Sequence, residues 1–127
     1  HDRSLLMHDN LISGDVRDRE TAYHEAKKFL QRDNPPDAII TVADTTALGV
    51  LAAAKDLQIK VPEKLSIIGA GNIPEASTST PALTTIGQMN LDFSEIFKML
   101  FSRLQSEAPL EGRMLDFPRV FIPRMTS

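Results

Sequence analysis

The chain contains no cysteine, which excludes a disulfide framework and a metal site built on thiolates. No apolar run approaches the roughly 20 residues that a membrane-spanning helix needs. A basic excess is also missing, since the formal net charge is −3, and this argues against a surface that attracts nucleic acid or an acidic membrane. Together these absences are typical of a cytoplasmic protein with no membrane contact.

What remains is the composition of an ordinary globular domain. The 127 residues are 42% hydrophobic and 24% charged, enough for one domain with a real core. The chain begins at His1 instead of methionine and shows no signal-like segment. We therefore expect it to be a piece of a longer protein, whose targeting it does not reveal.

The spacing of apolar residues predicts alternating helices and strands. The expected helices and strands are, in chain order, 19–32 (helix), 38–42 (strand), 44–57 (helix), 65–68 and 83–86 (strands), 91–104 (helix) and 120–122 (edge strand). A weaker strand signal ends at Leu11-Ile12, before Gly14-Asp15. The unit from strand 38–42 to strand 65–68 is strand, helix, strand, which predicts parallel pairing. The predicted fold class is therefore α/β, a mostly parallel sheet with helices on both faces.

Three local features sharpen this prediction. The run 38–42 is continuously apolar, as in a strand buried on both faces. Helix 44–57 is apolar on most of its circumference, so we expect it to be buried on more than one side. Gly49 within it predicts a close backbone approach, and Asp18 and Asp44 are candidate N-caps.

A turn at the end of strand 65–68 carries the most suggestive short motif, Gly69-Ala70-Gly71-Asn72. A strand that stops at GxG is how a dinucleotide-binding loop begins. Here the third glycine position holds Pro74, and no acidic residue lies about 20 residues on at the end of a following strand. The motif therefore indicates a turn at another kind of ligand site. In open α/β sheets such sites lie beyond the carboxyl ends of the strands, here after Val42, Ile68 and Ile86.

No catalytic or metal-binding constellation stands out. The histidines are not at metal-ligand spacing, and no GxSxG elbow is present. Three acidic residues near a helix start are better explained by capping and by the helix dipole than by acid–base chemistry (Asp15, Asp18 and Glu20). We predict a binding domain without catalytic residues, cofactor or metal.

Two segments carry a family resemblance. "PDAIITVADTTALGVLAAAKDLQIKVPEKLSIIGAGN" (36–72) and "PALTTIGQ" (81–88) resemble the effector-binding core of lactose/galactose-repressor (LacI/GalR) family transcription regulators. That family shows a PDAI strand, an Asp before an A-[LM]-G helix, VPEDLSIIGFDD and P-x-LTTI-x-Q. The similarity covers nearly the whole chain, and the two motifs at this spacing are a specific combination.

The resemblance implies one lobe of a periplasmic-binding-protein-like (type I) domain. Residues 1–127 would be mainly the C-terminal lobe of the effector-binding and dimerisation domain, and the helix at 90–106 would pack with an N-terminal lobe. A DNA-binding headpiece outside this chain would bind the operator, and a small-molecule effector, a sugar or related metabolite, would control it allosterically. The alternative is a periplasmic sugar-binding protein of an ABC transporter, which shares the fold. A Rossmann-type reductase is a third reading.

The resemblance also assigns the effector site. Asp44 matches the aspartate that opens the A-L-G helix, Gln88 the LTTI-x-Q glutamine, and Asn72 the second acidic position of the G-[FY]-D-D turn. Gly71 stands where the family usually has the aspartate that grips ligand hydroxyls, and Ala43 where many members have asparagine. These two departures argue against a conventional sugar effector, because sites that bind hydroxyls depend on such groups.

Two surfaces complete the expectations. By the resemblance, a homodimer would form through Leu48, Leu51, Ala52 and Lys55 of the A-L-G helix and through the loop of Glu75, Ala76, Ser77, Thr78, Ser79 and Thr80. Helix 91–104 carries an apolar stripe that should be covered. We expect it to dock on its own lobe, on a symmetry mate, or by exchange between chains.

Overall fold

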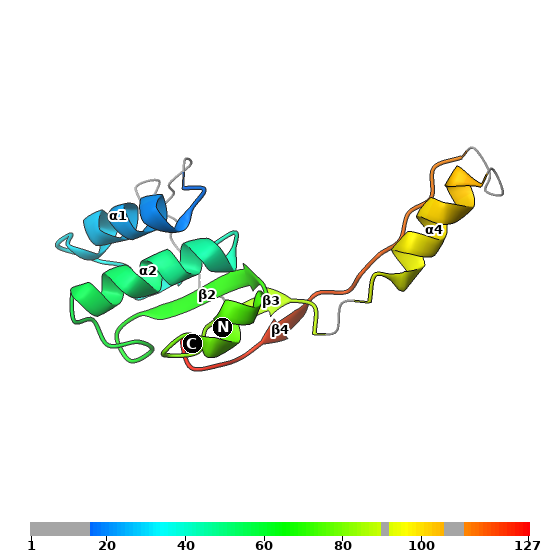
Figure 1. Cartoon of the computed structure of the whole chain (residues 1–127). Helices are drawn as coiled ribbons and strands as arrows, with labels where there is room; N and C mark the ends of the chain where they lie inside the picture. Colours follow the sequence, from blue (N-terminus) through cyan, green and yellow to red (C-terminus); the bar gives the residue numbers. More distant parts are fainter. Residues whose placement is uncertain (1–15, 90–91, 106–110) are drawn as a thin grey trace, which may run out of the picture.

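The computed structural model describes residues 16–89, 92–105 and 111–127. Its elements are α1 (Arg19–Leu30), β1 (Ala38–Ile40), α2 (Asp44–Asp56), β2 (Ser66–Gly71), α3 (Pro74–Thr78), β3 (Thr84–Gly87), α4 (Ser94–Leu104) and β4 (Val120–Ile122). The sheet order is β1-β2-β3-β4, with β1, β2 and β3 parallel and β4 antiparallel at the edge (Figure 1). The predicted order of elements and the mostly parallel sheet are confirmed. The weak strand at Leu11-Ile12, with His1, His8 and Asp15, lies outside the described residues.

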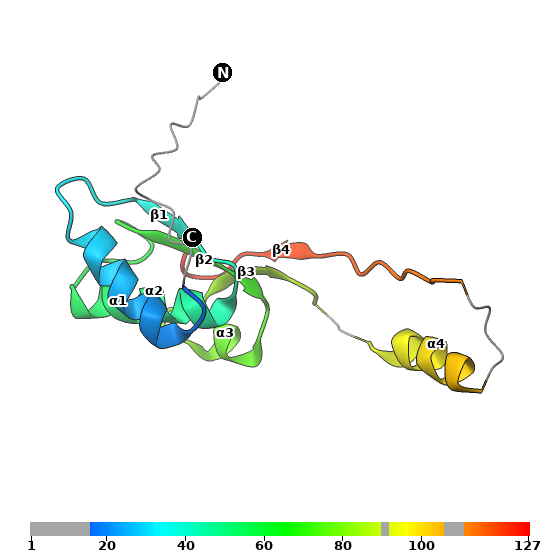
Figure 2. The same ribbon diagram turned by 90° about the horizontal axis from the view of Figure 1, so that it is seen from above.

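The helices α1, α2 and α3 all lie on one face of the sheet (Figure 2). The expectation of helices on both faces is therefore wrong for the described residues. The reason is the strand order, which advances from β1 to β2 to β3 without reversing. Right-handed crossovers that move in one direction place their helices on the same face. A second covered face requires a reversal of direction, and the described strands contain none.

Helix α2 forms the centre of the core. Nine of its residues are buried, between α1 on one side and β2 on the other. The prediction that α2 is buried on more than one side is confirmed, although its second side is covered within the chain. Gly49 faces α1, where an added Cβ would collide with the carbonyl oxygen of Arg19 and lie 2.9 Å from the Cβ of Ala22. The expected close backbone approach is confirmed.

Strand β1 is less buried than its apolar sequence predicts. Ile40 is 71% exposed, and Val42, just beyond the strand, is 86% exposed. The prediction of burial on both faces is wrong, because only one face of the sheet carries helices and β1 is an edge strand. A hollow of about 240 Å³ also separates β1 from α1.

The turn after β2 differs from its sequence prediction in two ways. Strand β2 continues through the GxG motif to Gly71 instead of ending before it, since Gly69, Ala70 and Gly71 pair with β3. The short helix α3 was not predicted. It begins with Pro74 at its first turn, where the missing N–H of proline costs nothing.

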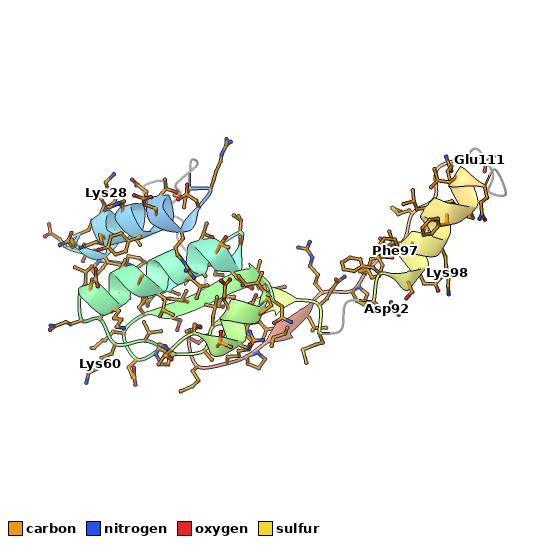
Figure 3. The ribbon with its side chains drawn as sticks, viewed as in Figure 1. Lys28, Lys60, Asp92, Phe97, Lys98 and Glu111 are labelled. Carbon is orange, nitrogen blue, oxygen red and sulfur yellow. The ribbon has the colours of Figure 1, made fainter. Side chains whose placement is uncertain are left out.

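Helix α4 stands apart from the α/β body, which comprises residues 16–89 and 120–127 (Figures 1 and 2). It contains no buried residue. Its side chains, Phe97 among them, lie away from the body (Figure 3). Large apolar side chains are exposed along its length: Phe93, Ile96, Phe97, Leu100, Phe101 and Leu104. Docking of α4 on its own lobe is therefore ruled out, and the two intermolecular possibilities stay predictions.

The start of α1 confirms Asp18 as an N-cap. The backbone N–H of Thr21 donates to its carboxylate at 2.8 Å, and the Thr21 hydroxyl accepts from the Asp18 N–H. These bonds to Thr21, the backbone bond first, hold the pKa of Asp18 below its ordinary value of 3.8. The charged cap therefore stabilises the fold fully when the pH is above the ordinary pKa of 3.8. Its contribution is lost as the pH falls through the lowered pKa of the folded state.

Asp18→Ala should lower the urea midpoint of unfolding near neutral pH, because the two bonds that the Thr21 N–H and the Thr21 hydroxyl donate to the carboxylate disappear. At a second, acidic pH below the lowered pKa of Asp18 the difference from the native chain should shrink, since the native carboxyl is then protonated too. Urea titrations at both pH values test this. An equal difference at the two pH values would contradict the assigned role of the charged cap.

Candidate ligand crevice

The carboxyl ends of β2 and β3 meet at a pair of glycines. Gly71 pairs with Gly87, and Gly71 has a φ of +125°, a conformation that side chains rarely adopt. A Cβ on Gly87 would lie 2.6 Å from the Cβ of Asn72 and 2.9 Å from its nitrogen. Both glycines are thus required by the backbone. At Gly71, restoring an aspartate would demand a change in backbone conformation as well as a side chain.

Asp44 lies behind this edge as a buried acceptor. It is 1% exposed, and its carboxylate accepts the Thr85 hydroxyl at 2.6 Å and the Ile73 N–H at 2.9 Å. The prediction that it caps α2 is wrong: Ala43 is the N-cap residue and makes no side-chain cap bond. Asp44 instead joins the start of α2 to β3 and to the turn after β2. Its side chain positions the crevice wall.

Asn72 connects three segments at the same edge. Its backbone has a φ of +56°, and its Nδ2 donates to the carbonyl of Gln88 at 2.7 Å. Its Oδ1 accepts from Nη2 of Arg124 at 2.7 Å, and the same guanidinium donates to the Leu83 carbonyl at 2.8 Å. Asn72 therefore fixes the chain at Gln88, where it leaves the body towards α4.

A hollow of about 210 Å³ lies at this edge. We call it the crevice hollow, and it is lined by Val42, Ala70, Gly71, Gly87, Gln88 and Arg119. Of the predicted effector residues, Gly71 and Gln88 line it, whereas Ala43, Asp44 and Asn72 do not. The Ala43 carbonyl accepts the hydroxyls of Thr41 and Thr46, each at 2.7 Å, so this residue supports the loop before α2. Contact of any of the five with an effector stays a prediction.

Arg119 and Arg124 are the residues that sequence reasoning missed. Arg124 lies 52 positions from Asn72, and no local pattern connects the two. Arg119 directly precedes β4, whose Val120 pairs with Gly87, and this pairing brings its side chain to the hollow. The position of Arg119 at the hollow and the bond of Arg124 to Asn72 follow only from the register in which β4 pairs with β3.

The predicted dimer residues divide into two groups. Ala52, Lys55, Glu75, Ser77, Thr78 and Thr80 are exposed, and Ser79 is half-buried. Leu48 and Leu51 are 7% and 8% exposed, and Ala76 belongs to the core. The helices that carry both groups, α2 and α3, lie on the same face of the sheet (Figure 2). A single chain does not test contacts between copies, so the interface stays a prediction.

Within residues 16–89, 92–105 and 111–127, no group of three or more His, Cys, Asp or Glu side chains could hold a metal ion. Across the same ranges, each helix is too short or too polar to cross a membrane.

Comparison with known proteins gives a consistent family. The profile of a periplasmic binding protein-like domain matches residues 3–127. The HTH-type transcriptional repressor PurR of Salmonella arizonae is 36% identical over 111 residues, which are 87% of this chain and 32% of the repressor. The chain thus spans about a third of the length of the curated relatives it matches.

Solved structures agree in fold. The transcription regulator CcpA of Lactococcus lactis superimposes with a TM-score of 0.81 at 25% identity, over 96% of this chain and 44% of that one. A LacI family transcriptional regulator from Lactobacillus casei with bound sucrose gives a TM-score of 0.81 at 19% identity, over 97% of this chain and 46% of that one. At that identity the second match shows the fold alone.

Proposed function

Because the chain belongs to the periplasmic binding protein-like domain family, as found in LacI/GalR-type regulators, we propose that it is the effector-binding and dimerisation lobe of a bacterial transcription regulator. The observation that carries this is the family match over residues 3–127, together with a hollow at the carboxyl edge of the sheet. DNA would be bound by a part outside these residues, in the cytoplasm. No catalytic role is proposed.

The crevice suits an allosteric role. Gln88 lines the hollow and is also the point from which the chain leaves the body towards α4. A ligand in the hollow therefore touches the segment that connects the body to α4. An effector shifts the conformational equilibrium of a regulator only if it binds one arrangement of the two lobes more tightly than the other. We propose that α4 packs with a second lobe, so that ligand binding favours one arrangement of the two.

A periplasmic sugar-binding protein is the second candidate, because it shares the fold. The sequence relationship favours the regulator, since the 36% identical relative is a repressor. The crevice hollow has no carboxylate among its lining residues for sugar hydroxyls, which argues against a sugar ligand for either candidate.

Operator binding by the natural gene product that contains these residues tests the proposal. Fluorescence anisotropy should show sequence-specific DNA binding, and a metabolite that raises the melting temperature should change the DNA affinity. A transporter subunit would instead bind its ligand and show no sequence-specific DNA binding. That result would reject the regulator and support the second candidate.

The dimer surface is proposed on the exposed side of α2 and α3. Ala52→Arg and Lys55→Glu should convert a dimer of the natural protein to monomers in sedimentation velocity, because a charge is introduced or reversed at a packed interface. Lys64→Glu, in the turn before β2, reverses an exposed charge elsewhere and serves as the control. If all three variants stay dimeric, the dimer forms through another surface.

A further inference from the structure

The crevice hollow has an unusual charge for this chain. The whole sequence has a net charge of −3, yet Arg119 is the single charged residue among the six that line the hollow. Its guanidinium has no hydrogen bond or ion pair within the described residues, so its five donors are available. Val120 pairs with Gly87, which keeps Arg119 at the mouth of the crevice.

The carboxylate behind the crevice wall, that of Asp44, already accepts hydrogen bonds. The carboxylate of Asp44 lies behind Gly71, where an added Cβ would be 3.7 Å from its Oδ2. Both of its oxygens accept hydrogen bonds, one from Thr85 and one from Ile73, and the residue is 1% exposed. Arg124 adds a second guanidinium to this edge through Asn72. The carboxyl edge of the sheet thus has two guanidinium groups, from Arg119 and Arg124, and the Asp44 carboxylate there is buried and hydrogen-bonded.

We infer that the effector carries an anionic group, a phosphate or a carboxylate, and that Arg119 binds it at the crevice hollow. The guanidinium presents paired donors that match the oxygens of either group. Gln88 lines the same hollow, and a side-chain amide of this kind can bind a neutral part of the ligand. This inference rests on the proposed function, because it names the chemical class of the effector at the proposed site.

Calorimetry on the natural protein with four probes tests the inference. Glucose, glucuronate and glucose 6-phosphate share one sugar ring and differ in the group on the terminal carbon, and inorganic phosphate has no ring. The native protein should bind at least one anionic probe, and bind it more tightly than glucose. The two anionic sugars distinguish a carboxylate from a phosphate ligand. Arg119→Gln should weaken anion binding by about tenfold to a hundredfold.

Two variants make the result specific. Arg119→Lys keeps the charge but not the paired donors, and should retain part of the affinity. Lys64→Gln removes a positive charge at the amino end of β2, away from the carboxyl end where the hollow lies, and should bind the probes as the native protein does. Circular dichroism confirms that the variants are folded.

The inference is overturned if glucose binds as tightly as the anionic probes, if none of the three anions binds, or if Arg119→Gln binds them unchanged. Operator binding, measured on the same native preparation, reports separately on the proposed function. Sequence-specific DNA binding together with any of those three results leaves the regulator standing and removes only the anionic effector.

Discussion

Replacing Asp44 with alanine is expected to lower the free energy of unfolding by about 3 kcal/mol, the sum of two lost charge-assisted hydrogen bonds at a buried site. The change leaves the Thr85 hydroxyl and the Ile73 N–H without their acceptor. Each buried donor left unsatisfied costs about 1–3 kcal/mol. Urea denaturation followed by circular dichroism gives the value directly.

Two comparisons show whether the loss comes from these bonds. Asp44→Asn keeps the shape and one acceptor oxygen, so it should lose less than the alanine variant. Asp33→Ala removes an exposed carboxylate in the bend after α1 and should change the stability by less than about 0.5 kcal/mol. If Asp44→Ala unfolds at the native midpoint, Asp44 does not hold the crevice wall.

Gly49→Val should have an effect of similar size, a loss of about 3 kcal/mol or more. The new side chain would meet the Arg19 carbonyl, with the Ala22 Cβ at 2.9 Å and the Tyr23 nitrogen at 3.1 Å from the added Cβ. Overpacking of a core typically costs about 1–3 kcal/mol, and here backbone atoms of α1 must move as well. The gain from replacing a helical glycine, at most about 1 kcal/mol, does not offset this.

The chain supplies two controls for that experiment. Gly112→Ala adds a Cβ with nothing within 4 Å and should leave the unfolding free energy unchanged within error. Ala52→Val places the same side chain on the exposed face of α2 and, at concentrations where the protein is monomeric, should cost about 0.5 kcal/mol from helix propensity. If Gly49→Val and Ala52→Val have the same urea midpoint, α1 moves away from the new side chain without a loss of unfolding free energy, and the prediction is wrong.

Local pattern was enough to predict most of the fold. The apolar spacing predicted α1 and α2 to within two residues, and Asp18 was identified as the cap of α1. The face on which helices pack was missed, because it depends on the direction in which successive crossovers move. That direction is a property of the strand order, to which residues far apart in sequence contribute.

The effector site stays a prediction, and the structure shows how its predicted residues are connected. Gly71 and Gln88 line the hollow as their motif positions indicate. Asp44 has the appearance of a cap because it begins a helix, yet its partner Thr85 lies 41 positions away. Arg119 and Arg124 reach the crevice only through the antiparallel pairing of β4 with β3. Hydrogen bonds over such separations have no signature in a local window.

The path of the chain around α4 has a mechanical consequence. The chain leaves the body at the end of β3 and returns at the start of β4, and these two strands are neighbours, with Gly87 opposite Val120. Both segments that connect α4 to the body are therefore held at one place, where β3 pairs with β4 beside the crevice hollow. If the partner that packs on α4 rotates, the two segments that connect α4 to the body would move together beside the crevice hollow. The hydrogen bonds from Arg124 to Asn72 and from Asn72 to the Gln88 carbonyl would oppose that movement.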